Sequence, residues 1–259
     1  MKDAGEENNI GETEKQSRMA IFLKANWENI IMANYAVPEE VLQPYLPKGV
    51  ELDLYNGKAY ASLVGFMFKD TRLFNIPIPK LGTFEEINLR FYVVRRAHNE
   101  IKRGVVFVNE TVPYKAVAWV ANKLYKEHYT AIPTKHEWHI NGASKNISYQ
   151  WKCNHRWNSI AVNAAVAGEK MQLHSFEEFI FEHYFGYTKT GEVSTEEYKI
   201  NHPSWQINKV HSSVIDCDFA GMYGSSFDFL SKETPASVFM AEGSSVEVEW
   251  KRNKLNFTS

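Results

Sequence analysis

Cysteine is scarce in this sequence, and its arrangement excludes a disulfide-stapled fold. The 259 residues include two cysteines, Cys153 and Cys217, which stand in dissimilar contexts. They form no Cys-x-x-Cys pair and outline no disulfide framework. Idle or buried thiols in a reducing cytoplasm are the simpler interpretation.

Long apolar runs and concentrated positive charge are also missing. The longest apolar runs fall far short of a membrane span. The formal net charge is −2, and the lysines and arginines are scattered rather than gathered into the basic stripe of a nucleic-acid surface. Residues 1–18 are polar and acidic, without the apolar core of a signal peptide. We expect a cytoplasmic protein with no nucleic-acid or membrane partner, and a homo-oligomer stays open.

The motifs characteristic of common enzyme classes are absent as well. The chain has no Gly-rich phosphate loop, no dinucleotide-binding fingerprint and no Gly-x-Ser-x-Gly elbow. His136 and His139 are three residues apart, which in a strand places them on opposite faces. We therefore expect no metal site and no cofactor.

What the sequence does contain is enough apolar material for a substantial core. Hydrophobic residues make up 44% of the chain and aromatic residues 14%, as in ordinary globular domains. No Pro/Gly/Ser-rich linker and no internal repeat divides the middle of the chain. We expect a single domain over residues 19–250, with tails at 1–18 and 251–259.

Three helices are expected. Pro38, followed by two acidic residues, is typical of a helix start. Ser175 and Glu178 have the spacing of a capping box, in which each side chain satisfies the other's amide. The clearest helix covers residues 113–129, where a single apolar stripe consists of Val117, Val120, Ala121, Leu124, Tyr125 and His128. In this stripe His128 is interpreted as a core histidine.

The rest of the chain predicts β-hairpins. Asn56-Gly57 and Asn141-Gly142 each stand between two alternating segments, and both residue types tolerate the positive φ of a tight hairpin turn. A third hairpin is expected to leave through residues 84–96 and return through "VVFVNE". Many hairpins with few helices favour an α+β fold that is predominantly antiparallel β, a sheet or barrel.

The segment "FEEINLRFYVV", residues 84–94, has two unlike faces. Ile87, Leu89, Phe91 and Val93 alternate with a polar row consisting of Glu86, Asn88, Arg90 and Tyr92. Period two is the signature of a strand. From the pattern alone the polar row could face solvent or line a pocket.

Several segments, in order, resemble the YqjF-like family of uncharacterised bacterial proteins. They are "WENIIMANYAVPEEVLQPYLPKGVELDLYNGKAYASLVGF", "FEEINLRFYVV", "RGVVFVNETVPYKAVAWVANKLYKEHY", "HSFEEFIFEHYFGYT" and "INHPSWQI". The resemblance spans about residues 27–250. That family looks related to acetoacetate decarboxylase, so it implies a cone-like antiparallel β-barrel with flanking helices.

The resemblance also implies where the site lies and which chemistry it lacks. The decarboxylase forms a Schiff base through a lysine whose pKa a second lysine lowers, and it has a glutamate at the equivalent of Glu86. The tandem lysine positions fall on Tyr129 and Thr130, and an arginine position falls near Asn34 and Tyr35. Neither phenol nor hydroxyl can supply the amine that an imine requires.

The implied site therefore combines several polar side chains. If Glu86 faces the cavity, Asn88 and Arg90 follow on the same face, and we expect Glu86 and Arg90 to neutralise each other. Tyr129 would reach the cavity from the helix end as a hydrogen-bond donor or weak acid. Further candidates for ligand contact are Tyr35, His202 and Trp205, the last two of which also suit packing around a Pro-containing turn. Lys126 is interpreted as a solvated lysine.

Three functions remain open at this level. The first is binding of a small polar or carbonyl-containing molecule in the barrel, without a Schiff-base lysine. The second is a lyase or hydrolase-type enzyme that uses Glu86 and Tyr129 as acid–base groups. The third is a structural protein with a filled cavity. The sequence leaves open whether the protein is an enzyme.

Overall fold

A computed structural model describes residues 21–97 and 100–258. Within them seven strands close into a barrel, because the last strand pairs with the first. In barrel order these are β1 (Ile21–Ala36), β3 (Tyr60–Leu73), β5 (Phe84–Ala97), β6 (Glu100–Val112), β11 (Phe185–Gly191), β12 (Ser194–Asn201) and β14 (Ser237–Asn256). The predicted barrel is confirmed, with one refinement: β6 and β11 run parallel, so the barrel is mixed.

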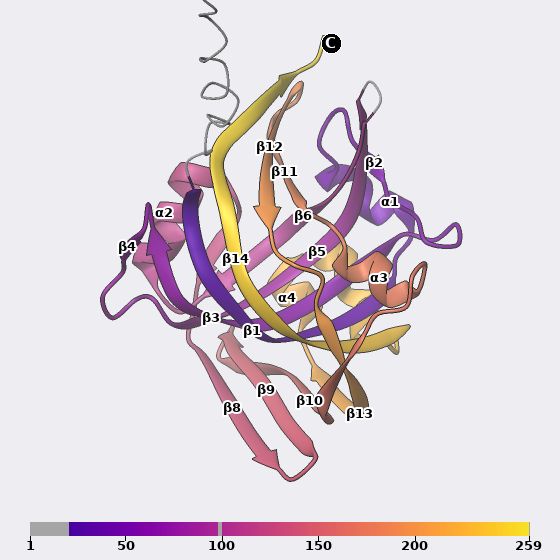
Figure 1. The fold of residues 1–259 in the computed structure, drawn as a ribbon. Coiled ribbons are helices and arrows are strands. Elements are labelled where there is room, and N and C mark those ends of the chain that lie inside the picture. The colour runs from indigo at the N-terminus through magenta and orange to yellow at the C-terminus, as the bar shows by residue number, and fades with distance from the viewer. Residues whose placement is uncertain (1–20, 98–99, 259) are drawn as a thin grey trace, which may run out of the picture.

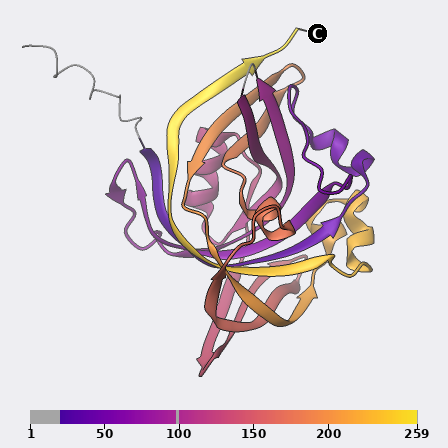
Figure 2. The ribbon, with the colours of Figure 1, turned by 45° about the vertical axis from the view of Figure 1, so that its right-hand side comes forward.

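The same sheet continues beyond the barrel as an extension that projects below it (Figures 1 and 2). Its order from the barrel outward is β14, β13 (Gln206–Asp216), β10 (Arg156–Lys170), β9 (Ser144–Cys153) and β8 (Thr134–Asn141). β14 belongs both to the barrel and to this extension, and its Gly243 has a φ of 85°, which suits glycine. A Cβ at Gly243 would lie 2.0 Å from the carbonyl oxygen of Trp27, so the strands need this glycine to pack closely.

The remaining elements are short and lie around the barrel. β2 (Glu51–Leu52) pairs with β5, β4 (Ile76–Pro77) pairs with β3, and β7 (Tyr129–Ala131) pairs in parallel with β6. The helices are α1 (Glu39–Leu42), η1 (Gln43–Tyr45), α2 (Lys115–Tyr125), α3 (Phe176–Phe181), α4 (Phe219–Tyr223) and η2 (Ser225–Ser231). None of the helices in residues 21–97 and 100–258 has the length and hydropathy needed to cross a bilayer.

Both faces of the barrel wall are buried, which creates two cores. On β5, Ile87, Leu89 and Phe91 pack outward with β9, β10, α4 and η2. The opposite parity faces the barrel interior, where Phe84 and Tyr92 join a second apolar cluster. The polar row of the 84–94 segment is therefore buried rather than solvated.

The hairpin predictions are confirmed at two turns and wrong at the third. β8 and β9 pair around Asn141-Gly142, and β5 pairs with β6. Asn56-Gly57 does turn, with φ of 49° and 73°, but only one bridge, between Tyr55 and Lys58, flanks it. The strand before this turn pairs not with β3 but with Val93 and Val94 of β5, just beyond the β5 residues that pair with β3.

The predicted helices are confirmed in position, but the long one is shorter than predicted. The long helix ends at Tyr125, where Lys126 adopts a left-handed conformation with φ of 51°. Pro38 precedes α1, and the Ser175 hydroxyl caps α3 by accepting from the Glu178 amide. The Glu178 carboxylate accepts from His174 rather than from Ser175.

Of the two predicted tails, the structure describes only the C-terminal one. Residues 1–18 lie outside the described residues. Residues 251–256 belong to β14 and pair with β12, so most of the expected C-terminal tail is a strand. The polar sequence at this chain end suggested a tail, but pairing with β12 makes it part of a strand.

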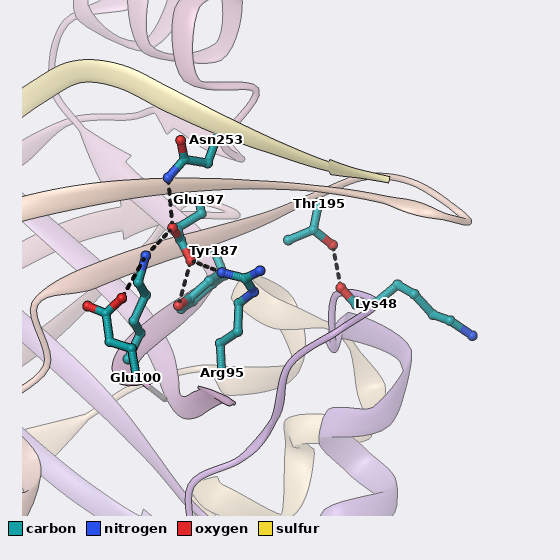
Figure 3. A network of polar contacts seen from close by, with 8 residues as sticks. Lys48, Arg95, Glu100, Tyr187, Thr195, Glu197 and Asn253 are labelled. Atoms are coloured by element: carbon teal, nitrogen blue, oxygen red, sulfur yellow. Dashed lines mark hydrogen bonds and ion pairs between the residues drawn. The ribbon is translucent and has the colours of Figure 1, made fainter. Parts of the chain in front are cut away.

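The parallel junction between β6 and β11 is the shortest seam of the barrel, with two residue pairs in register. A buried carboxylate, Glu197 on β12, compensates for it (Figure 3). Lys102 of β6 lies 2.9 Å and Arg95 of β5 lies 3.1 Å from its oxygens. Tyr187 of β11 and Asn253 of β14 donate to the same carboxylate at 3.1 and 2.9 Å. Although burial raises it, these donors hold the pKa of Glu197 below its ordinary value.

This network predicts a large loss of stability when the carboxylate is removed. Glu197→Ala leaves two cations and two donors without their partner, and breaking a buried pair in this way costs about 3–5 kcal/mol. Lys102 and Arg95 keep some solvent contact, so we expect the lower end of that range in urea unfolding. Glu247→Ala is the control, since the Lys24–Glu247 pair between β1 and β14 is exposed and should be worth about 0–1 kcal/mol. Equal losses in the two variants would contradict the role given to Glu197.

Candidate functional site

The barrel interior holds a cavity of about 180 Å³. Most of its wall is aromatic or aliphatic and comes from β1, β3, β6, β12, β14 and α2. Polar side chains interrupt this wall: Thr71, Glu86, Asn88, Arg90, Glu110, Glu127, Tyr129 and Tyr198. The filled cavity expected of a purely structural protein is therefore not observed.

Three of these polar residues come from the row that the sequence singled out. Glu86, Asn88 and Arg90 share one parity of β5 and all line the cavity. Asn88 donates to Glu86 Oε1 over 3.1 Å. The next residue of the row, Tyr92, lies beyond the cavity, where its hydroxyl shares a hydrogen bond of 2.6 Å with Ser62.

Glu110 is a second buried carboxyl, which was not predicted from the sequence. On β6 the register slips by one residue between the Leu89–Asn109 and Arg90–Phe107 pairs. This bulge changes the parity of β6, so Glu110 faces the same interior as Phe107. Regular alternation would have assigned Glu110 the outward parity of Val106 and Val108, and no sequence signal marks the bulge.

Tyr129 reaches the cavity from β7, not from the end of a helix as predicted. Asn122 of α2 holds its backbone from both sides, accepting from Tyr129 N at 2.7 Å and donating to Tyr129 O at 3.0 Å. β7 pairs with β6, and in this pairing Tyr129 lies opposite Glu110. The phenol donates to Glu86 Oε2 over 3.2 Å.

Glu127 is the third buried carboxyl and was also missed. The left-handed Lys126 ends α2 and turns the next side chain inward, so Glu127 is 6% exposed. Thr188 and Tyr198 both donate to Glu127 Oε1, at 2.5 and 2.9 Å. The predicted helix over residues 113–129 did not include this change of direction, so Glu127 was not recognised as a cavity residue. The same turn exposes His128, so the interpretation of His128 as a core residue is wrong.

Burial dominates the electrostatics of these carboxyls. Desolvation raises the pKa of Glu86 to about 7, against the opposing effects of Asn88, Tyr129 and Arg90. It also raises the pKa of Glu127 to about 7, although Thr188 and Tyr198 oppose the change. The pKa of Glu110 is raised well above its ordinary value by desolvation and by the other two carboxyls. At neutral pH the cluster therefore contains protonated carboxyls, which can donate hydrogen bonds.

Arg90 does not pair with Glu86 as the sequence analysis expected. Its Nη2 lies 3.6 Å from the sulfur of Met32, and the guanidinium lies 5.8 Å from the centre of the Tyr92 ring. Within residues 21–97 and 100–258 its buried Nε has no hydrogen-bond partner, and Arg90 forms no ion pair. Two residues of separation on one strand place the two groups on the same face without bringing them into contact.

The remaining predicted ligand contacts lie away from the cavity. Tyr35 has the opposite parity on β1 and packs against Phe219 in the outer core, with ring centres 5.5 Å apart. Its neighbour Asn34 points inward instead and accepts from Ser62. Tyr35 is therefore not a cavity residue, because the first strand enters the barrel with the other face turned inward.

His202 and Trp205 form a packing unit behind the cavity wall. Their rings stack with centres 4.2 Å apart, and the indole donates to Ser244. Trp205 contacts Trp27, which itself lines the cavity. The packing interpretation of this Pro-containing segment agrees with the structure.

No lysine appears among the described residues that line the cavity. Lys126 points to the surface and pairs with Glu196 at 2.8 Å. The described residues also contain no cluster of histidine, cysteine and acidic side chains that could hold a metal ion. His136 contacts Glu85 on the other face of β5, apart from His139.

The sequence of this chain is similar to those of known proteins. A family model described as "Uncharacterized conserved protein (COG2071)", DUF2071, matches residues 24–245. The chain belongs to the DUF2071 family. Uncharacterized protein YqjF of Bacillus subtilis (strain 168) is 28% identical over 117 residues, which are 45% of this chain and 47% of YqjF. The matched stretch thus spans about half the length of that relative.

Solved structures share the fold of this DUF2071 chain at low sequence identity. An acetoacetate decarboxylase-like enzyme from Sphingomonas wittichii RW1 is similar with a TM-score of 0.61 and 10% identity, covering 92% of this chain and 94% of the enzyme. Acetoacetate decarboxylase from Legionella pneumophila is similar with a TM-score of 0.58 and 11% identity, covering 99% and 96%. The fold is therefore acetoacetate decarboxylase-like, as the resemblance implied.

The raised carboxyl pKa values predict how stability depends on pH. Glu127 ionises near 4.5 when unfolded and near 7 when folded, so the stability it contributes is complete below pH 4.5 and is lost as pH rises through 7. Glu127→Gln removes this dependence. Relative to the wild type, its free energy of unfolding should rise by on the order of 3 kcal/mol between pH 5 and pH 8.

Urea unfolding of both proteins across this range measures the difference. Taking the difference cancels the opposite contribution of buried His183, whose pKa is lowered to about 4. Glu40→Gln on the exposed side of α1 is the control and should follow the wild type at every pH. A constant difference between Glu127→Gln and the wild type would show that Glu127 is ionised throughout.

Proposed function

We propose that this protein binds a small, partly polar molecule inside the barrel. The observation that carries the proposal is that, within residues 21–97 and 100–258, several buried polar atoms of cavity-lining residues have no hydrogen-bond partner: Trp27 Nε1, Thr71 Oγ1, Asn88 Oδ1, Arg90 Nε and Glu110 Oε2. Buried polar groups in folded proteins are normally satisfied, and each exception asks for an explanation. A ligand in the cavity would supply the missing partners.

The arrangement suits a ligand that is apolar at one end and polar at the other. Small-molecule sites are mostly apolar, with a few convergent polar groups that fix orientation. Here Glu86 and Tyr129 stand next to each other, and their hydrogen bond gives them a defined orientation. A carbonyl or hydroxyl oxygen of the ligand would take the place between them and Arg90.

The same cavity argues against imine chemistry. A Schiff base needs an unprotonated amine next to the substrate, and the described lining includes no lysine. Tyr129 and Thr130 occupy the positions where the decarboxylase resemblance expects lysines. We therefore infer that binding proceeds without a covalent adduct.

Ligand binding is tested by thermal unfolding with a panel of small ketones, acids, amides and alcohols. At least one compound should raise the unfolding midpoint of the wild type, because binding to the folded state alone stabilises it. Glu86→Gln and Tyr129→Phe should each reduce that rise, since each removes one polar contact with the ligand.

The matched control is Glu85→Gln. Glu85 is the neighbour of Glu86 on β5, but its carboxylate contacts Thr134 and His136 outside the cavity. Its ligand-induced rise, taken from its own unliganded midpoint, should equal that of the wild type. No response from any compound, or equal responses in Glu86→Gln and the wild type, would contradict the proposal.

A second candidate function is acid–base catalysis on the bound molecule. It rests on the pKa of Glu86, which burial raises to about 7, because a catalytic acid or base works best with a pKa near the working pH. Proton NMR of each binding compound in D₂O with the protein would reveal turnover or deuterium exchange. Glu86→Gln should abolish such a signal, whereas Glu85→Gln should not.

The absence of imine chemistry is tested by reductive trapping. Borohydride added to the protein with acetoacetate or pyruvate should leave the intact mass unchanged, because the described cavity offers no amine. A mass increase that maps to a lysine would contradict this part of the proposal.

A further inference from the structure

Arg90 is the only described cavity-lining side chain that carries a permanent charge, and it is 9% exposed. A buried guanidinium is costly unless an anion or several acceptors surround it. In the described chain its polar contact is the sulfur of Met32, a weak acceptor, and its Nε has none. Desolvation raises the pKa of Glu86 and the charge of Arg90 opposes that rise, but within the described residues no carboxylate forms an ion pair or a hydrogen bond with this guanidinium.

The size of the cavity restricts what that anion can be. A dry apolar cavity of about 150 Å³ in another protein holds benzene, and this cavity measures about 180 Å³. The space thus suits one six-membered ring with one small substituent, or a short alkyl chain of similar volume.

The walls restrict the rest of the molecule. Phe66, Phe68, Phe84, Phe107 and Trp27 all line the cavity, and Phe107 lies directly opposite Arg90 on the neighbouring strand. Aromatic rings of this kind favour an apolar, preferably flat, partner. The cavity thus joins an apolar chamber to a single buried cation.

From this geometry we propose that the ligand is a small monocarboxylate with an apolar body, such as an arylcarboxylate, whose carboxylate pairs with Arg90. The inference rests on the proposed binding function and names its ligand class. A planar guanidinium matches a carboxylate with two parallel hydrogen bonds. The ring or chain lies against the phenylalanines.

The neighbouring glutamates do not oppose this arrangement. Burial raises the pKa of Glu86 and of Glu127 to about 7, so below that pH their neutral forms, which do not repel a carboxylate, are favoured. Among the residues that the structure describes, Glu110 Oε2 has no hydrogen-bond partner, and a protonated Glu110 can donate to a carboxylate oxygen. Desolvation, which raises the pKa of Glu110, favours that protonated form.

The test compares matched pairs that differ in charge and hardly in shape. Calorimetric titration at pH 6 with benzoate and benzamide, and with phenylacetate and phenylacetamide, measures the preference of the unmodified protein. We expect at least one carboxylate to bind ten times or more tighter than its amide. Arg90→Met should lose that preference while still binding the amide, and Arg90→Lys should keep part of it because Lys retains the charge.

Arg72→Met is the matched control, because Arg72 lies on β3 outside the cavity and is exposed. It should keep the preference for the carboxylate. Binding of an amide with the affinity of its acid, or an unchanged preference in Arg90→Met, would overturn the inference but leave the proposed function in place. If neither acids nor amides bind and the wider panel also fails, both are wrong. The preference of the wild type decides the question even if Arg90→Met does not fold.

Discussion

Desolvation of carboxyl groups is the constraint on which the interior of this barrel depends. Glu86, Glu110 and Glu127 come from three segments, yet all reach one cavity whose other walls are largely aromatic and aliphatic. A carboxylate in such surroundings is costly, so burial favours the neutral acids and turns acceptors into potential donors. Hydrogen bonds from Asn88, Tyr129, Thr188 and Tyr198 then fix the geometry of two of the three groups.

The barrel wall keeps these groups in place through contacts on the far side of the cavity. β6 carries Glu110 and pairs with β7, which carries Tyr129, but it meets β11 over a short parallel seam. Glu197 joins strands on both sides of that seam, and Glu127 reaches across to β11 and β12 through Thr188 and Tyr198. Polar contacts therefore close the barrel and shape the cavity together.

The regular features of the fold could be predicted from the sequence, and the irregular ones could not. Alternation in residues 84–94 identified β5, and the resemblance indicated which face turns inward, so Glu86, Asn88 and Arg90 were found. Glu110 was missed because a one-residue bulge changes the parity of β6. Glu127 was missed and Tyr129 misplaced because Lys126 ends α2 early in a left-handed conformation that lysine rarely adopts. Tyr35 was assigned to the cavity because alignment near Asn34 could not decide between neighbouring residues of opposite parity.

The protonation state of the cavity carboxyls is the most direct test of this account. Carbon-13 NMR of protein labelled at the glutamate side-chain carboxyls can follow each titration, with Glu86→Gln, Glu110→Gln and Glu127→Gln providing the assignments. The structure predicts that Glu86 and Glu127 titrate near pH 7 and Glu110 above its ordinary range, whereas Glu197 titrates below its own. Titration of all three cavity carboxyls in the ordinary acidic range would mean that the cavity is hydrated and charged, and would contradict the account.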